Sequence, residues 1–181
     1  MIRLASSSIT RATLLKNAKI AFIQESVDFD EESIIASSAK NFVYQATLGK
    51  YEANLKAFGY EDMPLLVADT VVTSQDKILR KAKCKDDARN ILYTQSGNVT
   101  SIITCMIYQS QDQKIIDISQ TDYLFHRFDE DDLELYLESG EWRGKAGACM
   151  VEGFCKPYIK EVHGFESTAM GLNVEVLKRF L

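Results

Sequence analysis

Proline, tryptophan and histidine are scarce in this 181-residue chain, which contains two prolines, one tryptophan and two histidines. Its four cysteines include no CxxC pair, and so few potential ligands argue against a structural zinc site. The cysteines lie in apolar segments, which predicts reduced thiols in a reducing compartment. Because no linker composition or low-complexity segment interrupts the chain, residues 1–181 are expected to form a single domain.

Long apolar runs are also absent, since none approaches the roughly 20 residues that cross a bilayer. No charged and then apolar leader opens the chain, so we expect a cytoplasmic protein with no membrane partner. Basic residues are not in excess: 21 Lys and Arg oppose 26 Asp and Glu, a net charge of −5. This balance argues against a nucleic-acid polymer as partner, but a small anion needs only a few cations gathered in one cleft.

Apolar residues make up 46% of the chain, enough for a substantial core, and their pattern alternates between strands and helices. Strands are predicted at 2–5, 20–24, 65–72, 99–108, 115–128 and 158–162. Helices are predicted up to 15 and at 33–58, 86–95, 129–139 and from 174 onward. The pattern indicates an α/β fold with some antiparallel pairing.

A run of small hydroxyl residues follows the first predicted strand, and Arg11 lies in the first turn of the helix after it. Free N–H groups at a helix N-terminus, the hydroxyls of Ser6 and Ser8 and the fork of Arg11 together suit phosphate oxygens. The segment therefore suggests a phosphate-binding turn. An ordinary serine N-cap is the alternative.

Asp69 interrupts the apolar strand predicted at 65–72. An ionised carboxylate in a buried strand is unfavourable unless it is paired or binds a metal, which favours a catalytic or metal-binding role. The alternative is a structural carboxylate that caps a turn at the end of the strand.

Lys50 lies within an apolar stripe of the helix predicted at 33–58, whose members recur every three or four residues (Val43, Ala46, Ala53 and Ala57). A lysine at such a position either extends outward to solvent or faces a cavity that holds an anion. The pattern alone favours solvent.

Two short basic stretches, around Lys81 and Lys145, place lysines beside small residues or glycines. Each could present an ammonium group and backbone N–H groups to phosphate, although each also fits a solvated loop. Asp30 and Glu31 could join Asp69 around a divalent cation, for which oxygen ligands favour Mg²⁺ or Mn²⁺.

Seven segments resemble, in order and at matching intervals, the motifs of the Maf family of nucleoside triphosphate pyrophosphatases. They are LASSSITRATLL, VDFDEE, LGKYEA, VADTVV, ILRKAK, GEWRGKAG and GFESTAMGLN. Together they extend from Leu4 to Asn173, nearly the whole chain.

The resemblance implies a two-lobed α/β fold with a long mixed central sheet, flanking helices and an active cleft between the lobes. It implies hydrolysis of a nucleoside triphosphate to the monophosphate and pyrophosphate with a divalent metal, Mg²⁺ or Mn²⁺, commonly by a homodimer. Asp69 matches the family's proton acceptor and Glu31 its acidic position, and both would hold the metal. The positions that match phosphate-binding residues are Ser6, Ser8, Arg11, Lys50, Lys81 and Lys145.

The base preference does not follow from the resemblance. Thr10 lies where the branch acting on dTTP and UTP has Pro-Arg-Arg and the branch acting on 7-methyl-GTP has tryptophan before the arginine. Thr70 resembles the first branch and Glu152 the second. A different class of function also remains open, a nucleotide-binding regulator of septum formation without turnover. Trp142 is expected either to pack in the core or to stack on the base.

Overall fold

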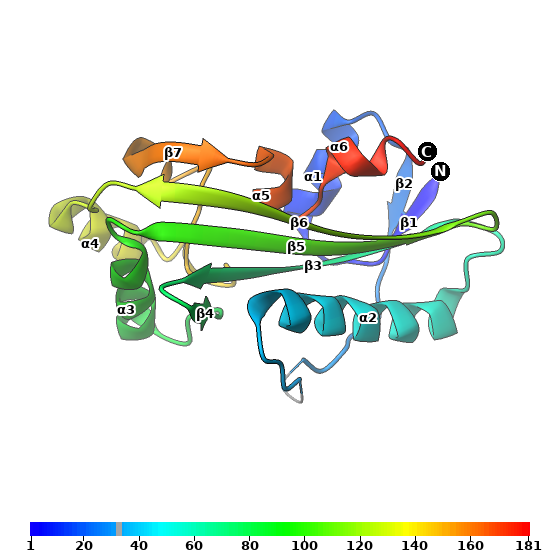
Figure 1. Ribbon diagram of the computed structural model, residues 1–181, viewed down its shortest axis with the longest axis horizontal. Helices are drawn as coiled ribbons and strands as arrows, with labels where there is room; N and C mark the ends of the chain where they lie inside the picture. The colour runs from blue at the N-terminus through cyan, green and yellow to red at the C-terminus, as the bar shows by residue number, and fades with distance from the viewer. Residues whose placement is uncertain (32–33) are drawn as a thin grey trace. The chain divides into compact units, whose positions relative to one another are not determined.

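Strands and helices alternate along the chain, as the sequence predicts. In order they are β1 (Ile2–Leu4), α1 (Ile9–Asn17), β2 (Phe22–Gln24), α2 (Ala39–Phe58), β3 (Leu65–Ser74), β4 (Lys77–Leu79), α3 (Lys85–Gln95), β5 (Val99–Gln109), β6 (Lys114–Phe125), α4 (Glu130–Ser139), the short 3₁₀ helix η1 (Lys156–Tyr158), β7 (Ile159–His163), α5 (Glu166–Ala169) and α6 (Val174–Leu177). This computed structural model describes residues 1–31 and 34–181 (Figure 1).

The described strands form one seven-stranded mixed sheet in the order β2-β1-β3-β5-β6-β7, with β4 paired to β3 outside this path. β1 runs parallel to β2 and β3, whereas β3 and β4, and likewise β6 and β7, are antiparallel. The predicted fold class, α/β with a mixed central sheet flanked by helices, is confirmed.

The chain divides into two compact units. The first contains Met1–Thr70, Ile103–Ser119 and Phe165–Leu181, and the second contains Val71–Ile102 and Gln120–Gly164. Strands β3, β5 and β6 each have residues in both units.

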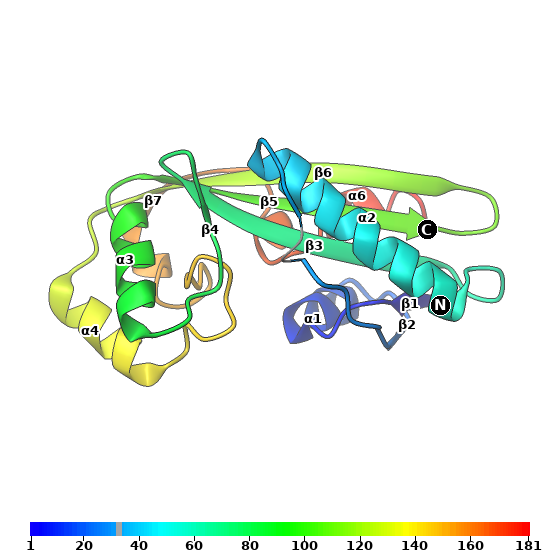
Figure 2. The same cartoon turned by 90° about the horizontal axis from the view of Figure 1, so that it is seen from below.

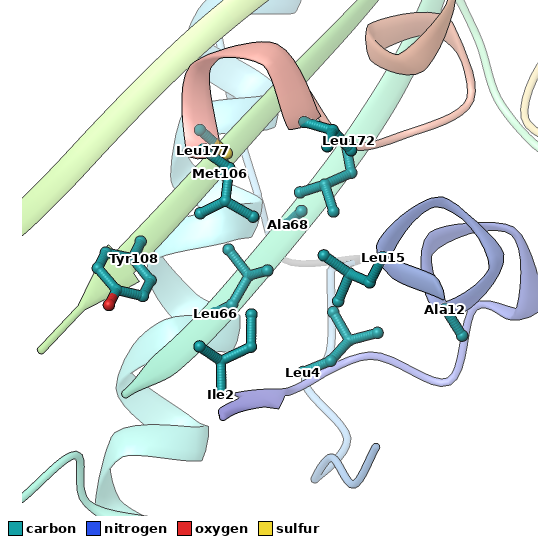
Figure 3. Close-up of a cluster of buried hydrophobic side chains, with 11 residues drawn as sticks. Ile2, Leu4, Ala12, Leu15, Leu66, Ala68, Met106, Tyr108, Leu172 and Leu177 are labelled. Carbon is teal, nitrogen blue, oxygen red and sulfur yellow. The ribbon is translucent and has the colours of Figure 1, made fainter. Parts of the chain in front are cut away.

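In the first unit, α2 covers one face of the sheet and α1 and α6 cover the other (Figures 1 and 2). The side chains of β3 alternate between these faces, as the two-residue period of a strand requires. Leu66 and Ala68 pack with α1 and α6 in one buried cluster, shown in Figure 3, whereas Leu65 and Val67 pack against Tyr51 of α2. This alternation determines the face of the sheet to which the side chains of Asp69 and Thr70 point.

Ion pairs and aromatic contacts link the elements of the second unit. Arg89 of α3 pairs with Glu134 of α4, and Lys85 pairs with Glu138. Rings pack at centroid distances of 4.4 to 5.6 Å in a group formed by Phe125, Phe128, Tyr136, Phe154 and Tyr158. Phe125, Phe128 and Tyr136 of this group are buried and form part of the core of this unit.

The predicted start of the long helix was wrong. Its first residue, Ser33, lies outside the described residues, and residues 34–38 are not helical. Ser38 has an extended backbone, and its hydroxyl accepts a hydrogen bond from the Asn41 N–H, so the N-cap lies at Ser38. The predicted end of the helix at residue 58 is confirmed, since Gly59 caps α2 with a φ of 64°.

The strand predicted at 115–128 ends earlier, at Phe125. The hairpin between β3 and β4 was not predicted, because Gln75 and Asp76 adopt φ angles of 50° and 59° without the glycine that usually marks such a turn. In the part of the chain that the structure describes, no helix has both the length and the apolar character needed to cross a membrane.

Candidate active site

The turn between β1 and α1 is held together by its serines. The Ser6 hydroxyl accepts a hydrogen bond from the Ser8 N–H at 3.2 Å, and Ser8 caps α1 by accepting from the Arg11 N–H at 3.3 Å. Gln24 of β2 donates to the carbonyls of Ser6 and Ser8, at 2.7 and 3.2 Å. Ser8 is therefore an ordinary N-cap. A cap satisfies only part of the first helical turn, so this role is compatible with binding an anion there.

The Arg11 guanidinium is held at three points. Its Nε donates to the Gly171 carbonyl at 2.8 Å, one terminal nitrogen donates to Ser6 Oγ at 3.0 Å, and the other donates to Thr70 Oγ1 at 3.1 Å. Burial lowers the pKa of this guanidinium, and the charges of Asp69 and Glu31 act in the opposite direction. Arginine stays protonated in proteins, so Arg11 supplies a fixed cation.

Asp69 and Thr70 are consecutive residues of β3 and serve opposite faces of the sheet. The Thr70 hydroxyl reaches Arg11 on the α1 face, whereas the Asp69 carboxylate meets Lys50 of α2 on the other, with 2.9 Å between Lys50 Nζ and Asp69 Oδ1. Asp69 is 9% exposed, so its charge is placed in a largely dehydrated position that requires the lysine.

Lys50 also forms an ion pair with Glu31. Its ammonium group therefore joins two carboxylates from distant parts of the chain, and it does not extend to solvent alone. The buried face of α2 also differs from the predicted stripe: Ala57 is exposed, while Thr47, Tyr51 and Asn54 are buried. Lys50 consequently lies at the edge of the packed face.

Two contacts anchor the segment that carries Glu31 to α2. The Val27 N–H donates to Asn54 Oδ1 at 3.0 Å. The ring of Phe29 lies directly over Gly49, where an added Cβ would come within 2.1 Å of the ring. Only a residue without a side chain permits this packing, which places Glu31 two residues further on, beside Lys50.

The second unit brings Lys81 and Lys145 onto neighbouring segments. Lys81 forms an isolated antiparallel bridge with Ala146, the residue after Lys145. The Gly147 N–H donates to the Arg80 carbonyl at 3.2 Å, and the Gly147 carbonyl accepts from the buried Gln95 amide at 2.7 Å. Lys81 is exposed and Lys145 is partly buried.

The residues expected to read the base lie in different parts of the chain. Thr10 is partly buried in the first turn of α1, Thr70 lies against Arg11, and Glu152 is exposed in the second unit. Trp142 is 2% exposed and donates its indole N–H to the Leu137 carbonyl at 2.9 Å. It is therefore a packing residue.

No group of three or more His, Cys, Asp or Glu side chains among residues 1–31 and 34–181 is arranged to hold a metal. Among the described residues, Glu31 and Asp69 bring two carboxylates together at Lys50, and these could serve as oxygen donors to a metal. Mg²⁺ is commonly bound by one or two carboxylates together with substrate phosphates, so this donor set fits a metal that arrives with a nucleotide.

The sequence matches the family described as Maf-like protein over residues 1–181. The chain belongs to this family. A relative from a Nitratiruptor species is 58% identical over 179 residues, 98% of this chain and 96% of the relative. A relative from Campylobacter jejuni is 39% identical over the full length of both chains, and one from Helicobacter pylori is 40% identical over 96% of this chain and 91% of its own. All three are named nucleoside triphosphate pyrophosphatase, which is a hydrolase.

Sequence reasoning missed four residues that contact the site in this Maf-like chain: Phe29, Gly49, Gly171 and Thr104, whose hydroxyl lies 2.9 Å from that of Thr70. Gly49 carried a signal, since a glycine inside a predicted helix costs about 1 kcal/mol and needs a packing reason. Gly171 has a φ of 103° and approaches both Arg11 and Thr70, to 3.3 Å from an added Cβ. Phe29 and Thr104 carried no signal, because an aromatic residue in a turn and a threonine in a strand are both ordinary.

Proposed function

We propose that this protein hydrolyses a nucleoside triphosphate between its α and β phosphates and releases the monophosphate and pyrophosphate. Membership of the Maf-like family and the names of the relatives support the reaction class. The observation that carries the proposal is the pairing of Asp69 with Lys50, which Glu31 joins. Although the Arg11 side chain bonds Thr70 on the other face of the sheet, it is near enough for the charges of Asp69 and Glu31 to act on the pKa of its guanidinium.

Phosphoryl transfer requires mainly that the protein position the substrate and neutralise charge on its phosphate oxygens. In the first unit, Arg11 and the serine turn at the start of α1 are suited to this, because they combine a fixed cation with hydroxyl and N–H donors. Lys50 would add a second cation, and Lys81 and Lys145 of the second unit are proposed as further phosphate ligands.

Asp69 is proposed to orient a water molecule, or remove its proton, for attack at the α-phosphate. Its contact with Lys50 fixes the direction of the carboxylate, while Glu31 shares the same ammonium group. A positioned general base contributes on the order of 10² to 10⁴ in rate. The proton would pass to the carboxylate as the bond from the α-phosphorus to the bridging oxygen breaks and pyrophosphate leaves.

We also propose that Glu31 and Asp69 hold a divalent cation, Mg²⁺ or Mn²⁺, when a nucleotide is bound. The bound metal would neutralise charge on the phosphate oxygens. This fits the chemistry of the donor set, two carboxylates with room in their coordination for phosphate oxygens. For the base, Thr10, Thr70 and Glu152 are the proposed specificity residues, with dTTP, UTP and 7-methyl-GTP as the candidate substrates.

Purified protein should be assayed with a panel of common and modified triphosphates, with Mg²⁺ or Mn²⁺, in water enriched in ¹⁸O. We expect equal release of monophosphate and pyrophosphate, with the label in the monophosphate. Label in the pyrophosphate would show attack at the β-phosphate and contradict the proposal. Nucleotide binding without turnover would favour the alternative, a regulator of septum formation.

The family resemblance supports a homodimer, which light scattering would test. The free thiols support a cytoplasmic location, which cell fractionation would test.

A further inference from the structure

Thr104 of β5 is a buried hydroxyl that neither the sequence motifs nor the proposed reaction uses. It is 1% exposed, and its Oγ1 lies 2.7 Å from the Thr168 carbonyl and 2.9 Å from Thr70 Oγ1. Burying a hydroxyl is unfavourable unless it is hydrogen-bonded, and valine would fill the same volume without that requirement. The contacts of Thr104 therefore indicate what its hydroxyl does.

The direction of each hydrogen bond in this group follows from counting protons. A carbonyl can only accept, so the single proton of the Thr104 hydroxyl is used on Thr168. Thr104 must then accept from Thr70, so the Thr70 proton points at Thr104. The lone pairs of Thr70 are left for Arg11, which can only donate.

The result is a hydrogen-bond relay, in which every bond donates in the same direction. It runs from the Arg11 cation through Thr70 and Thr104 to the Thr168 carbonyl. Each member is confined to one role by its neighbours, and hydrogen bonds in such a chain polarise one another. Rotation of the Thr70 hydroxyl toward another acceptor would break two contacts at once.

Arg11 is the member of this relay that can bind a ligand. Of its five N–H groups, three donate to described residues, namely to Gly171, Ser6 and Thr70, which leaves two for a ligand. Contacts on all three nitrogens oppose rotation of the guanidinium, so the remaining N–H groups keep a fixed direction. A fixed planar fork suits phosphate oxygens better than a rotating one.

We propose that Thr104 is a positioning residue, which fixes the Thr70 hydroxyl and through it the guanidinium of Arg11 for binding the nucleotide's phosphates. The inference deepens the proposed function and rests on it for the nature of the ligand. Thr104 itself does not touch the substrate.

Two substitutions separate the hydroxyl from the packing. Thr104→Val keeps the volume and removes the hydroxyl, whereas Thr104→Ser removes a methyl group and keeps the hydroxyl. We expect Thr104→Val to lower kcat/KM about tenfold, mainly through KM, since a phosphate contact acts in the ground and transition states alike. Thr104→Ser should stay within about twofold of the parent even where its unfolding temperature falls. In a Thr70→Val background, adding Thr104→Val should cause no further loss.

A spectroscopic readout tests the relay without substrate. By ¹⁵N NMR at low temperature, the two terminal nitrogens of Arg11 should give separate signals in the parent and in Thr104→Ser, and exchange-averaged signals in Thr104→Val. Averaged signals in the parent would overturn the proposal whether or not any variant folds. Separate signals in folded Thr104→Val, or equal losses of kcat/KM in the Val and Ser variants, would also overturn it. The expected NMR pattern in a protein that cleaves no triphosphate would refute the proposed function and leave the relay standing.

Discussion

The ring of Phe29 occupies the space that a side chain at Gly49 would need, one residue before Lys50 in α2. Alanine normally stabilises a helix interior by about 1 kcal/mol relative to glycine. At this position its methyl group would displace the ring and the segment that holds Glu31 at Lys50. We expect Gly49→Ala to lower kcat about tenfold, while the unfolding temperature changes by only a few degrees because helix propensity offsets the lost contact.

Phe29→Ala provides the control for this prediction, because it removes the same contact from the other side. Its kcat should fall by a similar factor, and the double variant should be no slower than either single one. Independent, multiplying losses would show that Gly49 acts on α2 itself and not through Phe29.

Lys50 and Lys56 lie on the same helix and differ in their contacts, since Lys56 is exposed whereas Lys50 joins Asp69 and Glu31. Lys50→Met should lower kcat/KM by a factor of about 10² or more, because it leaves two neighbouring carboxylates without their cation and removes a phosphate ligand. Lys56→Met should retain the parental value. Steady-state kinetics of both variants should be measured, with circular dichroism to verify folding. Similar losses of kcat/KM in the two variants would show that the overall charge of the helix, and not the contacts of Lys50, determines activity.

Lys81 and Lys145 should act chiefly on substrate binding. We expect Lys81→Met and Lys145→Met each to raise KM roughly tenfold with a smaller change in kcat, as for contacts shared by ground and transition states. Lys83 is exposed two residues from Lys81 and serves as the matched control. The KM of Lys83→Met should equal that of the parent, and an unchanged KM in the other two would remove these lysines from the phosphate site.

Cys105 predicts a loss of stability at alkaline pH. Burial raises the pKa of its thiol from 9.0 to about 11, so above about pH 9 the unfolded chain releases a proton that the folded state retains. The contribution of the protonated Cys105 thiol to the free energy of unfolding is fully present below about pH 9. It falls by roughly 2 to 3 kcal/mol as the pH rises through about 11. Urea unfolding at about pH 8 and about pH 11 should show a smaller difference for Cys105→Ala than for the parent. The exposed Cys84→Ala should match the parent, and a parental difference in Cys105→Ala would contradict the assignment.

The α/β class and most elements could be predicted from the sequence because they depend on local period and on end signals. Gly59 and Gly140 end their helices with positive φ angles, and Asp129 caps α4, as their positions indicate. The start of α2 could not be read in the same way. Several serines precede that helix, and residue type alone does not say which of them caps it, whereas the structure shows the capping hydrogen bond at Ser38.

The site was predictable as far as motif residues carry it. Once β3 is a strand with apolar residues on both faces, the side chains of Asp69 and Thr70 must point to opposite faces. The sequence alone does not say which residues pack on each face. The apolar pattern of its helix favoured a solvent-exposed Lys50, whereas the resemblance to the Maf family indicated a phosphate-binding residue. Thr104 could not be found, since its role comes from a hydrogen-bond direction that exists only in three dimensions.

Asp69→Asn tests the central claim most directly. The substitution preserves shape and leaves Lys50 paired with Glu31, so the protein should unfold within a few degrees of the parent. Its single-turnover rate at saturating triphosphate and metal should be at least roughly 10² lower, since the amide cannot accept the proton from the attacking water. A folded Asp69→Asn protein that cleaves triphosphate at the parental rate would contradict the account.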